Sequence, residues 1–251
     1  MRLVTLPRRR ILAAHEARVT HPGTSGWNLL PLYLDSVVYP GWHPRYGEVG
    51  PVYAFLLESD DYLVLVDTGI GPPHDLIDRL YQPTRRDLPT ALAQNNGIAI
   101  DDISAVVLTH LHFDHIGGAQ HFHGTPLYVQ RAEWEAAQAP KYTIPEFLDF
   151  PGANFVLLDG ETELAPGLRL VPTPGHTPGH QVVVLETPAR RMAIAGQAVE
   201  TAAEYRRMLS GEAEMTESGR AIAGLEPAKV WFSHDHQCWQ PLELPSAAKP
   251  T

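Results

Sequence analysis

The segment from His110 to His115 places three imidazoles and one carboxylate within six residues, in the pattern H-x-H-x-D-H. His110 and His112 are two positions apart, so in an extended stretch their side chains point to the same side. Asp114 and His115 follow where the chain bends and can face a second point. Neutral imidazole and carboxylate are the ligands that zinc and iron sites use. The spacing therefore predicts that one short segment offers ligands to two metal ions.

Two later segments also carry histidine where an apolar run ends. The apolar residues 168–171 precede a loop rich in glycine and proline that contains His176 and His180. Proline stiffens such a loop, so its imidazoles lose little conformational freedom on binding. The strand-like run 230–233 is followed by His234 and His236. A lone histidine is more often a core or surface residue than a ligand, but three such clusters together favour a metal site.

These clusters need a scaffold of strands that brings them to one place, since loops on rigid strands commonly carry chemistry. Strands are predicted from apolar and alternating runs at 52–57, 62–66, 103–108, 126–130, 155–158, 168–171, 181–186, 191–195 and 230–233. Helices are predicted at 75–81, 88–94, 131–138 and 201–208, with Asp87 as a cap and Gly97 as a stop for the second. Hairpin turns are expected at 59–61 and 187–190.

The composition fits one domain over residues 1–251, with a flexible tail expected from about residue 243. The 44% of hydrophobic residues suffices for a sizeable core, and the net charge of −10 argues against nucleic-acid binding. No apolar run approaches a membrane span, and the arginines at 8–10 lack the apolar segment that a signal peptide needs. The single cysteine, Cys238, excludes an internal disulfide, so a cytoplasmic location is expected. The oligomeric state stays open.

The order of these motifs resembles the metallo-β-lactamase superfamily of hydrolases over about residues 50 to 240. The resemblance rests on VDTG at 66–69, the H-x-H-x-D-H segment, PGH at 174–176 and SHD at 233–235. The strings LTHLHFDHIGG and YVQRAEWEAA are most similar to the branch that contains N-acyl homoserine lactonases. The resemblance implies an α/β fold, a four-layer αββα sandwich with the site at one edge of the two sheets.

The resemblance also implies roles for individual residues. A first metal would be held by His110, His112 and His176, and a second by Asp114, His115 and His234. Asp67 would lie below the site and bond the ligand loop, whereas His180 and His236 would make loop hydrogen bonds. The remaining histidines match no ligand position: His15, His21, His43, His74, His121 and His123.

One position departs from the family pattern. Gln197 stands where the family usually has an aspartate that bridges the two metals. An amide is neutral and has one good acceptor oxygen, so a second metal held partly by Gln197 should bind more weakly or be absent. Glu200 is a candidate replacement carboxylate, in a neighbourhood where lactonases often carry a substrate-directed tyrosine. Alternatively, Glu200 is a capping or solvated acid at the start of the 201–208 helix.

The implied activity is metal-dependent hydrolysis of an ester or lactone, with hydroxide generated on the metal as the nucleophile. One or two zinc ions are the expected cofactor, with iron or manganese as alternatives. Asp114 is the expected catalytic group, which orients the nucleophile and passes a proton to the leaving alkoxide, aided by Glu200. Three alternatives stay open: a single-iron oxidoreductase of the persulfide dioxygenase type, a β-lactam hydrolase, and a binding protein with a degenerate site.

Two aromatic, turn-rich segments, 39–47 and 140–151, are candidate walls of a substrate pocket. Exposed apolar loops often line pockets, and an apolar wall would suit a small-molecule substrate such as an acyl ester or lactone. The alternative is that these aromatic side chains pack onto the core.

Overall fold

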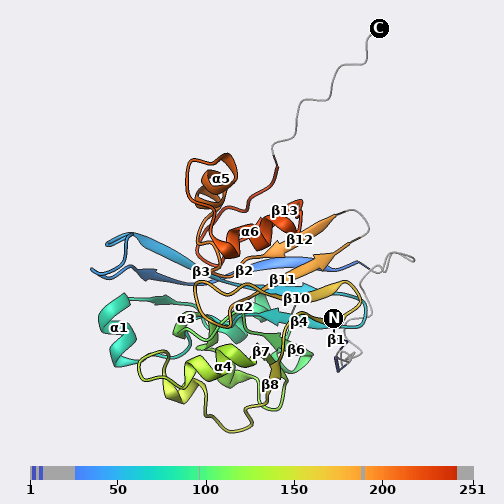
Figure 1. Ribbon diagram of the computed structural model, residues 1–251. Coiled ribbons are helices and arrows are strands. Elements are labelled where there is room, and N and C mark those ends of the chain that lie inside the picture. The colour runs from blue at the N-terminus through green and yellow to red at the C-terminus, as the bar shows by residue number, and fades with distance from the viewer. Residues whose placement is uncertain (1, 4–5, 8–25, 96, 188–189, 242–251) are drawn as a thin grey trace.

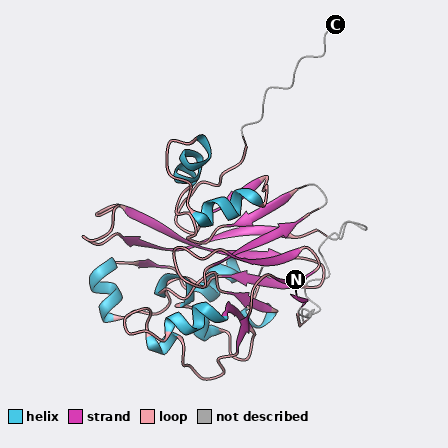
Figure 2. Cartoon of the chain, viewed as in Figure 1, coloured by secondary structure: helices cyan, strands magenta, loops and turns pink. Residues whose placement is uncertain are grey.

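Two β-sheets packed face to face form the centre of the molecule, and helices cover the outer face of each sheet (Figure 1 and Figure 2). The computed structural model describes residues 2–3, 6–7, 26–95, 97–187 and 190–241. This arrangement confirms the four-layer αββα sandwich expected from the sequence. The arginines at 8–10, His15, His21 and the tail from about residue 243 lie outside the described residues.

The larger sheet has seven strands in the order β5-β2-β3-β4-β6-β7-β8. Its strands are β2 (Asn28–Val38), β3 (Val49–Glu58), β4 (Leu63–Val66), β5 (Thr84–Arg85), β6 (Ala105–Val107), β7 (Leu127–Gln130) and β8 (Phe155–Leu158). Because β4, β6, β7 and β8 are parallel, the chain must cross the sheet between them, and these crossovers carry helices. The helices are α1 (Asp75–Tyr81), α2 (Leu88–Gln94), α3 (Phe113–Ile116) and α4 (Arg131–Ala137).

The smaller sheet has six strands in the order β1-β9-β10-β11-β12-β13. Its strands are β1 (Arg2–Leu3), β9 (Thr162–Ala165), β10 (Leu168–Pro172), β11 (Gln181–Glu186), β12 (Arg191–Ile194) and β13 (Lys229–Trp231). Helices α5 (Ala202–Ser210) and α6 (Glu217–Gly224) lie between the parallel strands β12 and β13. Among the described residues, no helix is both long and apolar enough to cross a membrane.

Three hydrophobic layers hold the sandwich together. The middle layer packs Phe55 and Val107 of the larger sheet with Val183 of the smaller one. An outer layer lies under α1 and α2, and another lies under α5 and α6. Strand β11 contributes to both the middle layer and the layer under α5 and α6, since Val183 faces the other sheet while Val182 and Val184 face the helices. Burial on both faces explains why this strand reads as an unbroken apolar run.

The loops that carry the histidine clusters leave the sheets at one edge. Strands β4 and β6 are parallel, so Asp67 and the 110–115 segment emerge side by side. The turn between β10 and β11 lies at the edge where the parallel strands β12 and β13 end. Gln181 joins the two sheets there, because its backbone N–H donates to the Thr109 carbonyl over 2.9 Å. Strand order alone therefore brings distant segments together.

Most predicted elements lie where the sequence placed them, and α1 and α2 cover the predicted ranges. Asp87 caps α2 by accepting from the Thr90 N–H. The predicted strand 103–108 is confined to 105–107, because a 3₁₀ turn precedes it and Thr109 already bonds the Asp67 carboxylate. Helix α5 begins at Ala202, one residue later than predicted, because Thr201 is its cap.

Six strands and α-helices were not predicted: β1, β2, β5, β9, α3 and α6. Strand β2 contains Pro31, which normally excludes a central strand. Proline is tolerated there because β5, the strand next to β2, pairs only with Asp35 and Ser36. The part of β2 around Pro31 does not pair with β5. Helix α6 contains Gly219 and Gly224, which have low helix propensity.

Replacing Phe55 with alanine should lower the free energy of unfolding by about 3–5 kcal/mol, because it leaves a cavity between the two sheets. The Phe55 side chain is fully buried and packs in the middle layer. Denaturant unfolding measures the change. The matched control is Tyr46→Ala, at a side chain that is 72% exposed, which should change stability by less than about 0.5 kcal/mol. Equal effects of the two substitutions would contradict this packing.

Candidate metal centre

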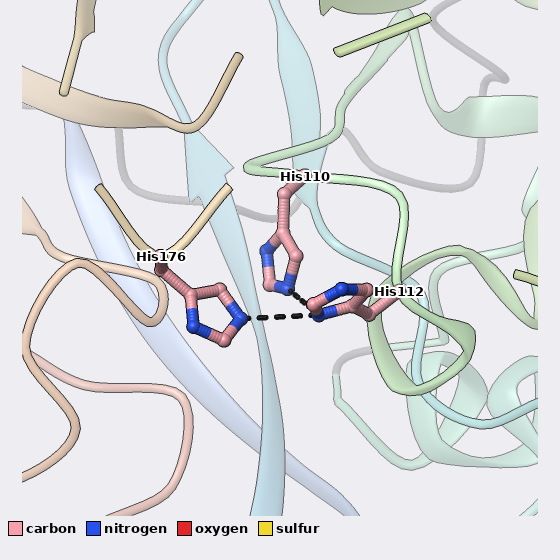
Figure 3. Close-up of side chains that lie close together, drawn as sticks. All are labelled: His110, His112 and His176. Carbon is pink, nitrogen blue, oxygen red and sulfur yellow. Dashed lines mark hydrogen bonds between the residues drawn. The ribbon is translucent and has the colours of Figure 1, made fainter. Parts of the chain in front are cut away.

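His110, His112 and His176 converge on one point at the edge of the sandwich (Figure 3). His110 Nε2 lies 3.1 Å from His112 Nδ1, and His176 Nε2 lies 3.0 Å from that same atom. We call these residues the three-histidine cluster. Its donor nitrogens lie within 4.8 Å of one another, which suits three ligands of one zinc ion at about 2.0–2.1 Å each.

Asp114, His115 and His234 form a second group of converging ligand atoms, which we call the carboxylate cluster. His115 Nε2 and His234 Nε2 are 3.3 Å apart. Asp114 Oδ2 lies 3.5 Å from His234 Nε2 and 3.9 Å from His115 Nε2. The structure thus gathers all six residues expected from the sequence into the two expected groups. A set of two imidazoles and one carboxylate also suits a divalent transition metal.

Each buried ring of the carboxylate cluster is fixed through its other nitrogen. His115 Nδ1 lies 2.8 Å from Asp67 Oδ2, and His234 Nδ1 donates to the Pro51 carbonyl over 2.9 Å. Because Nδ1 is paired in both rings, Nε2 is the nitrogen that is free to bind a metal ion. Asp67 also accepts from the Thr109 N–H over 2.8 Å, which fixes the start of the ligand loop. Asp67 therefore bonds the ligand loop as expected.

Burial keeps the three-histidine cluster uncharged, which is the form that binds metal. Burial lowers the pKa of His110 and His112, and loss of hydration together with the neighbouring His112 ring lowers the pKa of His176 to about 3.

The carboxylate cluster behaves differently. Burial would raise the pKa of Asp114, but nearby imidazoles, His115 first, outweigh it and lower that pKa. Burial would lower the pKa of His115, but the carboxylates of Asp67 and Asp114 outweigh it and raise that pKa.

Two glycines allow the backbone after β4 to touch the backbone after α3. A Cβ on Gly71 would lie 2.1 Å from the Gly117 oxygen, and a Cβ on Gly117 would lie 1.9 Å from the Ile70 oxygen. Neither position can accept a side chain without movement of the main chain. Hydrogen bonds join the same two segments, including Thr68 N–H to the His115 carbonyl over 2.7 Å. The ligand loop is therefore seated directly on the loop that carries Asp67.

Gln197 lies beside the carboxylate cluster, where its side chain interacts with the His115 ring. Its backbone N–H donates to His180 Nε2 over 3.2 Å. A neutral amide thus occupies the neighbourhood in which the family pattern has a charged aspartate.

Glu200 forms an ion pair that neither sequence interpretation anticipated. Its Oε1 accepts from Arg45 Nη1 over 3.2 Å and lies 4.0 Å from His43 Nε2. Among the described residues it belongs to neither group of converging ligand atoms, and Thr201 provides the helix cap. The Arg45–Glu200 ion pair instead ties the loop between β2 and β3 to the start of α5.

The other histidines near the site hold loops in place, as expected. His180 is fully buried, and its Nδ1 lies 3.0 Å from Thr173 Oγ1. His236 pairs with the Tyr53 hydroxyl over 2.9 Å.

A cavity of about 420 Å³ opens beside His176. Its wall includes His43, Gln197, Glu200, Glu204 and Glu217. This wall combines three carboxylates with apolar surface such as Ala198 and Val199, and of the two aromatic segments only His43 contributes to it. Most of the aromatic and apolar side chains of segment 140–151 instead pack into the core, including Ile144, Phe147 and Phe150.

Aromatic side chains line the site on other sides. The Tyr142 ring lies 5.1 Å from the His112 ring. Phe113, inside the ligand segment, lies 4.6 Å from Tyr81, and Tyr81 lies 6.3 Å from Trp42. Trp42 is 66% exposed, so this row of three rings leads from the ligand loop to solvent.

Glu133 is a site residue that sequence reasoning missed. It is fully buried in the first turn of α4 and bonds both loops of the three-histidine cluster. In the sequence it reads as an ordinary helix acid between Arg131 and Glu135, and only its place in the YVQRAEWEAA string pointed to it.

A model of the metallo-beta-lactamase superfamily matches residues 47–234. An N-acyl homoserine lactonase of Bacillus sp is 37% identical over 150 residues, which cover 55% of this chain and 59% of that relative. A probable metallo-hydrolase of Mycobacterium tuberculosis is 33% identical over 174 residues, which cover 58% of this chain and 56% of that relative. The chain thus spans about three fifths of the length of the curated relatives it matches.

A solved N-acyl homoserine lactone hydrolase, with the product N-hexanoyl-L-homoserine bound at its catalytic metal centre, has a similar fold. Its TM-score is 0.66 at 25% identity, covering 85% of this chain and 94% of that chain. The chain belongs to the metallo-beta-lactamase superfamily, because the family model covers most of it and includes both clusters. The similarity to lactonases within that superfamily is also confirmed.

Protein stripped of metal should be less stable at pH 5 than at pH 7. The pKa lies below the usual 6.5 in five histidines: His110, His112, His176, His180 and His234. Below about pH 6.5 the unfolded chain therefore takes up protons that the folded chain does not, and stability falls. His115 and Asp35 have raised pKa values and act in the opposite sense, but they are two groups against five. Urea unfolding of chelator-treated protein at both pH values checks the sign, and equal stability would contradict it.

Proposed function

We propose that the protein is a metal-dependent hydrolase that opens lactones, with N-acyl homoserine lactones as the substrate class to test first. The observation that carries the proposal is the pair of converging clusters, His110, His112 and His176 beside Asp114, His115 and His234. The similarity to N-acyl homoserine lactonases supports the same reaction. It favours lactone hydrolysis over an iron oxidoreductase or a β-lactam hydrolase. The single cysteine fits a cytoplasmic location, which we also propose.

The donor sets fit two metal ions, and we propose zinc at both positions. Three neutral imidazoles suit a zinc ion with one open position, and the carboxylate cluster suits a second ion. A bound divalent cation would polarise the substrate carbonyl and lower the pKa of a water molecule toward about 7. Because Gln197 adds no negative charge, the carboxylate cluster should hold its ion less tightly than the three-histidine cluster does.

Asp114 is the residue that we propose for proton transfer. Its lowered pKa keeps the carboxylate ionised at neutral pH, so it can accept a proton. In the reaction, water adds to the carbonyl carbon and the ring C–O bond breaks, which leaves a hydroxy acid. Asp114 would accept the proton from the attacking water and return it to the leaving alkoxide. Glu200, paired with Arg45, would shape the cavity wall rather than share this proton.

The row formed by Phe113, Tyr81 and Trp42 is the proposed contact for an apolar acyl chain. These rings lead outward from the ligand segment, and apolar contact of this kind needs no hydrogen-bond partner in the substrate. The cavity beside His176, whose wall carries polar side chains such as Gln197 and Ser218, would take the more polar end of the substrate.

His112→Ala should remove metal from the three-histidine cluster and abolish lactone hydrolysis, because two imidazoles remain where three are needed. Zinc content by elemental analysis and turnover of N-hexanoyl homoserine lactone are the two measurements. His236→Ala is the matched control, because His236 bonds Tyr53 outside both clusters. Full metal content in His112→Ala would refute the assignment, and a native protein that binds zinc but hydrolyses only non-lactone esters would refute the substrate class.

Gln197→Asp should raise the affinity of the carboxylate cluster for its ion, because a carboxylate adds a negative charge and a second donor oxygen. In the native protein, mild chelation should empty the carboxylate cluster first and leave the three-histidine cluster occupied. Competition titration of both proteins against a chelator is the measurement. If both proteins release two ions at the same chelator concentration, Gln197 does not limit the second site.

That result would have two explanations: either Gln197 does not limit the second site, or Glu200 already supplies the missing carboxylate. Glu200→Gln separates them. Since Glu200 bonds Arg45 and belongs to neither cluster, the substitution should leave the affinity for the second ion unchanged. Loss of that ion in Glu200→Gln would instead make Glu200 the replacement carboxylate.

A further inference from the structure

Glu133 connects the two loops that supply the three-histidine cluster. Its Oε1 accepts from the N–H of Leu111, the residue between His110 and His112, over 2.9 Å. Its Oε2 accepts from Thr177 Oγ1 over 2.7 Å and from the Gly179 N–H over 3.1 Å, in the loop that carries His176. One carboxylate group therefore bonds both loops, one oxygen to each.

The fit between these loops and α4 is close. A Cβ on Gly179 would lie 2.0 Å from the Glu133 backbone nitrogen, so the loop rests directly on the first turn of the helix. Oε1 also accepts from the Tyr142 hydroxyl over 2.5 Å, and the Tyr142 ring faces His112. Glu133 is fully buried, and each of its oxygens has two donors. Such a network fixes the position of every group that it bonds.

The charge of Glu133 matters for the same cluster. The three histidines contain no carboxylate, so a bound cation there would meet only neutral ligands. The negative charge of Glu133 stabilises a positive charge at the His112 ring. Partners that orient metal-binding imidazoles typically change metal affinity by about 10–100-fold when they are removed.

We propose that Glu133 is a positioning residue for the three-histidine cluster: it holds His112 and His176 at one metal ion and lends that ion a negative charge. The proposal rests on the proposed metal-dependent function. It does not extend to the carboxylate cluster, whose rings are fixed by Asp67 and Pro51 instead. Loss of the Glu133 charge should therefore weaken one metal position and leave the other unchanged.

The experiment measures zinc affinity, by competition with a chromophoric chelator, for one cluster at a time. In a His234→Ala background only the three-histidine cluster is complete, and in a His112→Ala background only the carboxylate cluster is complete. Glu133→Gln is introduced into each. Glutamine keeps one acceptor oxygen, so it can bond one loop and not both. Glu135→Gln is the matched control, since it removes the same charge from an exposed position of the same helix.

Glu133→Gln should weaken zinc binding roughly 10–100-fold in the His234→Ala background and leave it unchanged in the His112→Ala background. An equal loss in both backgrounds would show a general loss of folding and overturn the proposal, as would no loss in the first. Thr177→Val removes a single donor to Oε2 and should cause a smaller loss in the same background, which tests the proposal if Glu133→Gln does not fold. If His234→Ala with native Glu133 binds no zinc, the proposed metal site itself is wrong.

Discussion

The site depends on the hydrogen bonds that fix the histidine rings of the carboxylate cluster through the nitrogen that does not bind metal. An imidazole without a partner could turn, but Asp67 holds His115 and the Pro51 carbonyl holds His234, so each presents Nε2 inward. Asp67 itself has φ 59°, in the left-handed region that aspartate tolerates better than most residues. Its bonds to Thr109 and His115 offset a backbone cost of about 1–3 kcal/mol. A buried carboxylate thus sets both the chain direction and the ring orientation.

The two-sheet architecture explains why ligands so far apart in sequence meet. The strands before Asp67, His110 and His234 all end at one edge, and the turn that carries His176 lies at that edge too. Gln181 closes the arrangement by bonding the smaller sheet to the backbone just before His110. The middle hydrophobic layer then fixes the distance between the sheets, so the spacing of the ligands is a consequence of core packing.

Residues that a local pattern or a family motif marks could be predicted, including the distant His176 and His234. Residues whose role arises only from contacts between distant segments could not. The H-x-H-x-D-H pattern shows its chemistry within six positions, α1 follows from local periodicity, and α2 follows from periodicity and its Asp87 cap. The Arg45–Glu200 pair joins residues 155 positions apart, and no local pattern marks either as a partner. The role of Glu133 could not be predicted for the same reason, because its burial results from the two loops that fold over it.

The contact between Gly71 and Gly117 has a consequence for motion. Where two main chains touch without side chains between them, their separation is set by atomic radii and has no rotamers through which to relax. The segments after β4 and α3 are therefore expected to fluctuate as one rigid body, so that Asp67 and His115 move together. Any opening of the site must come from elements on its other sides, such as the loop from β2 to β3.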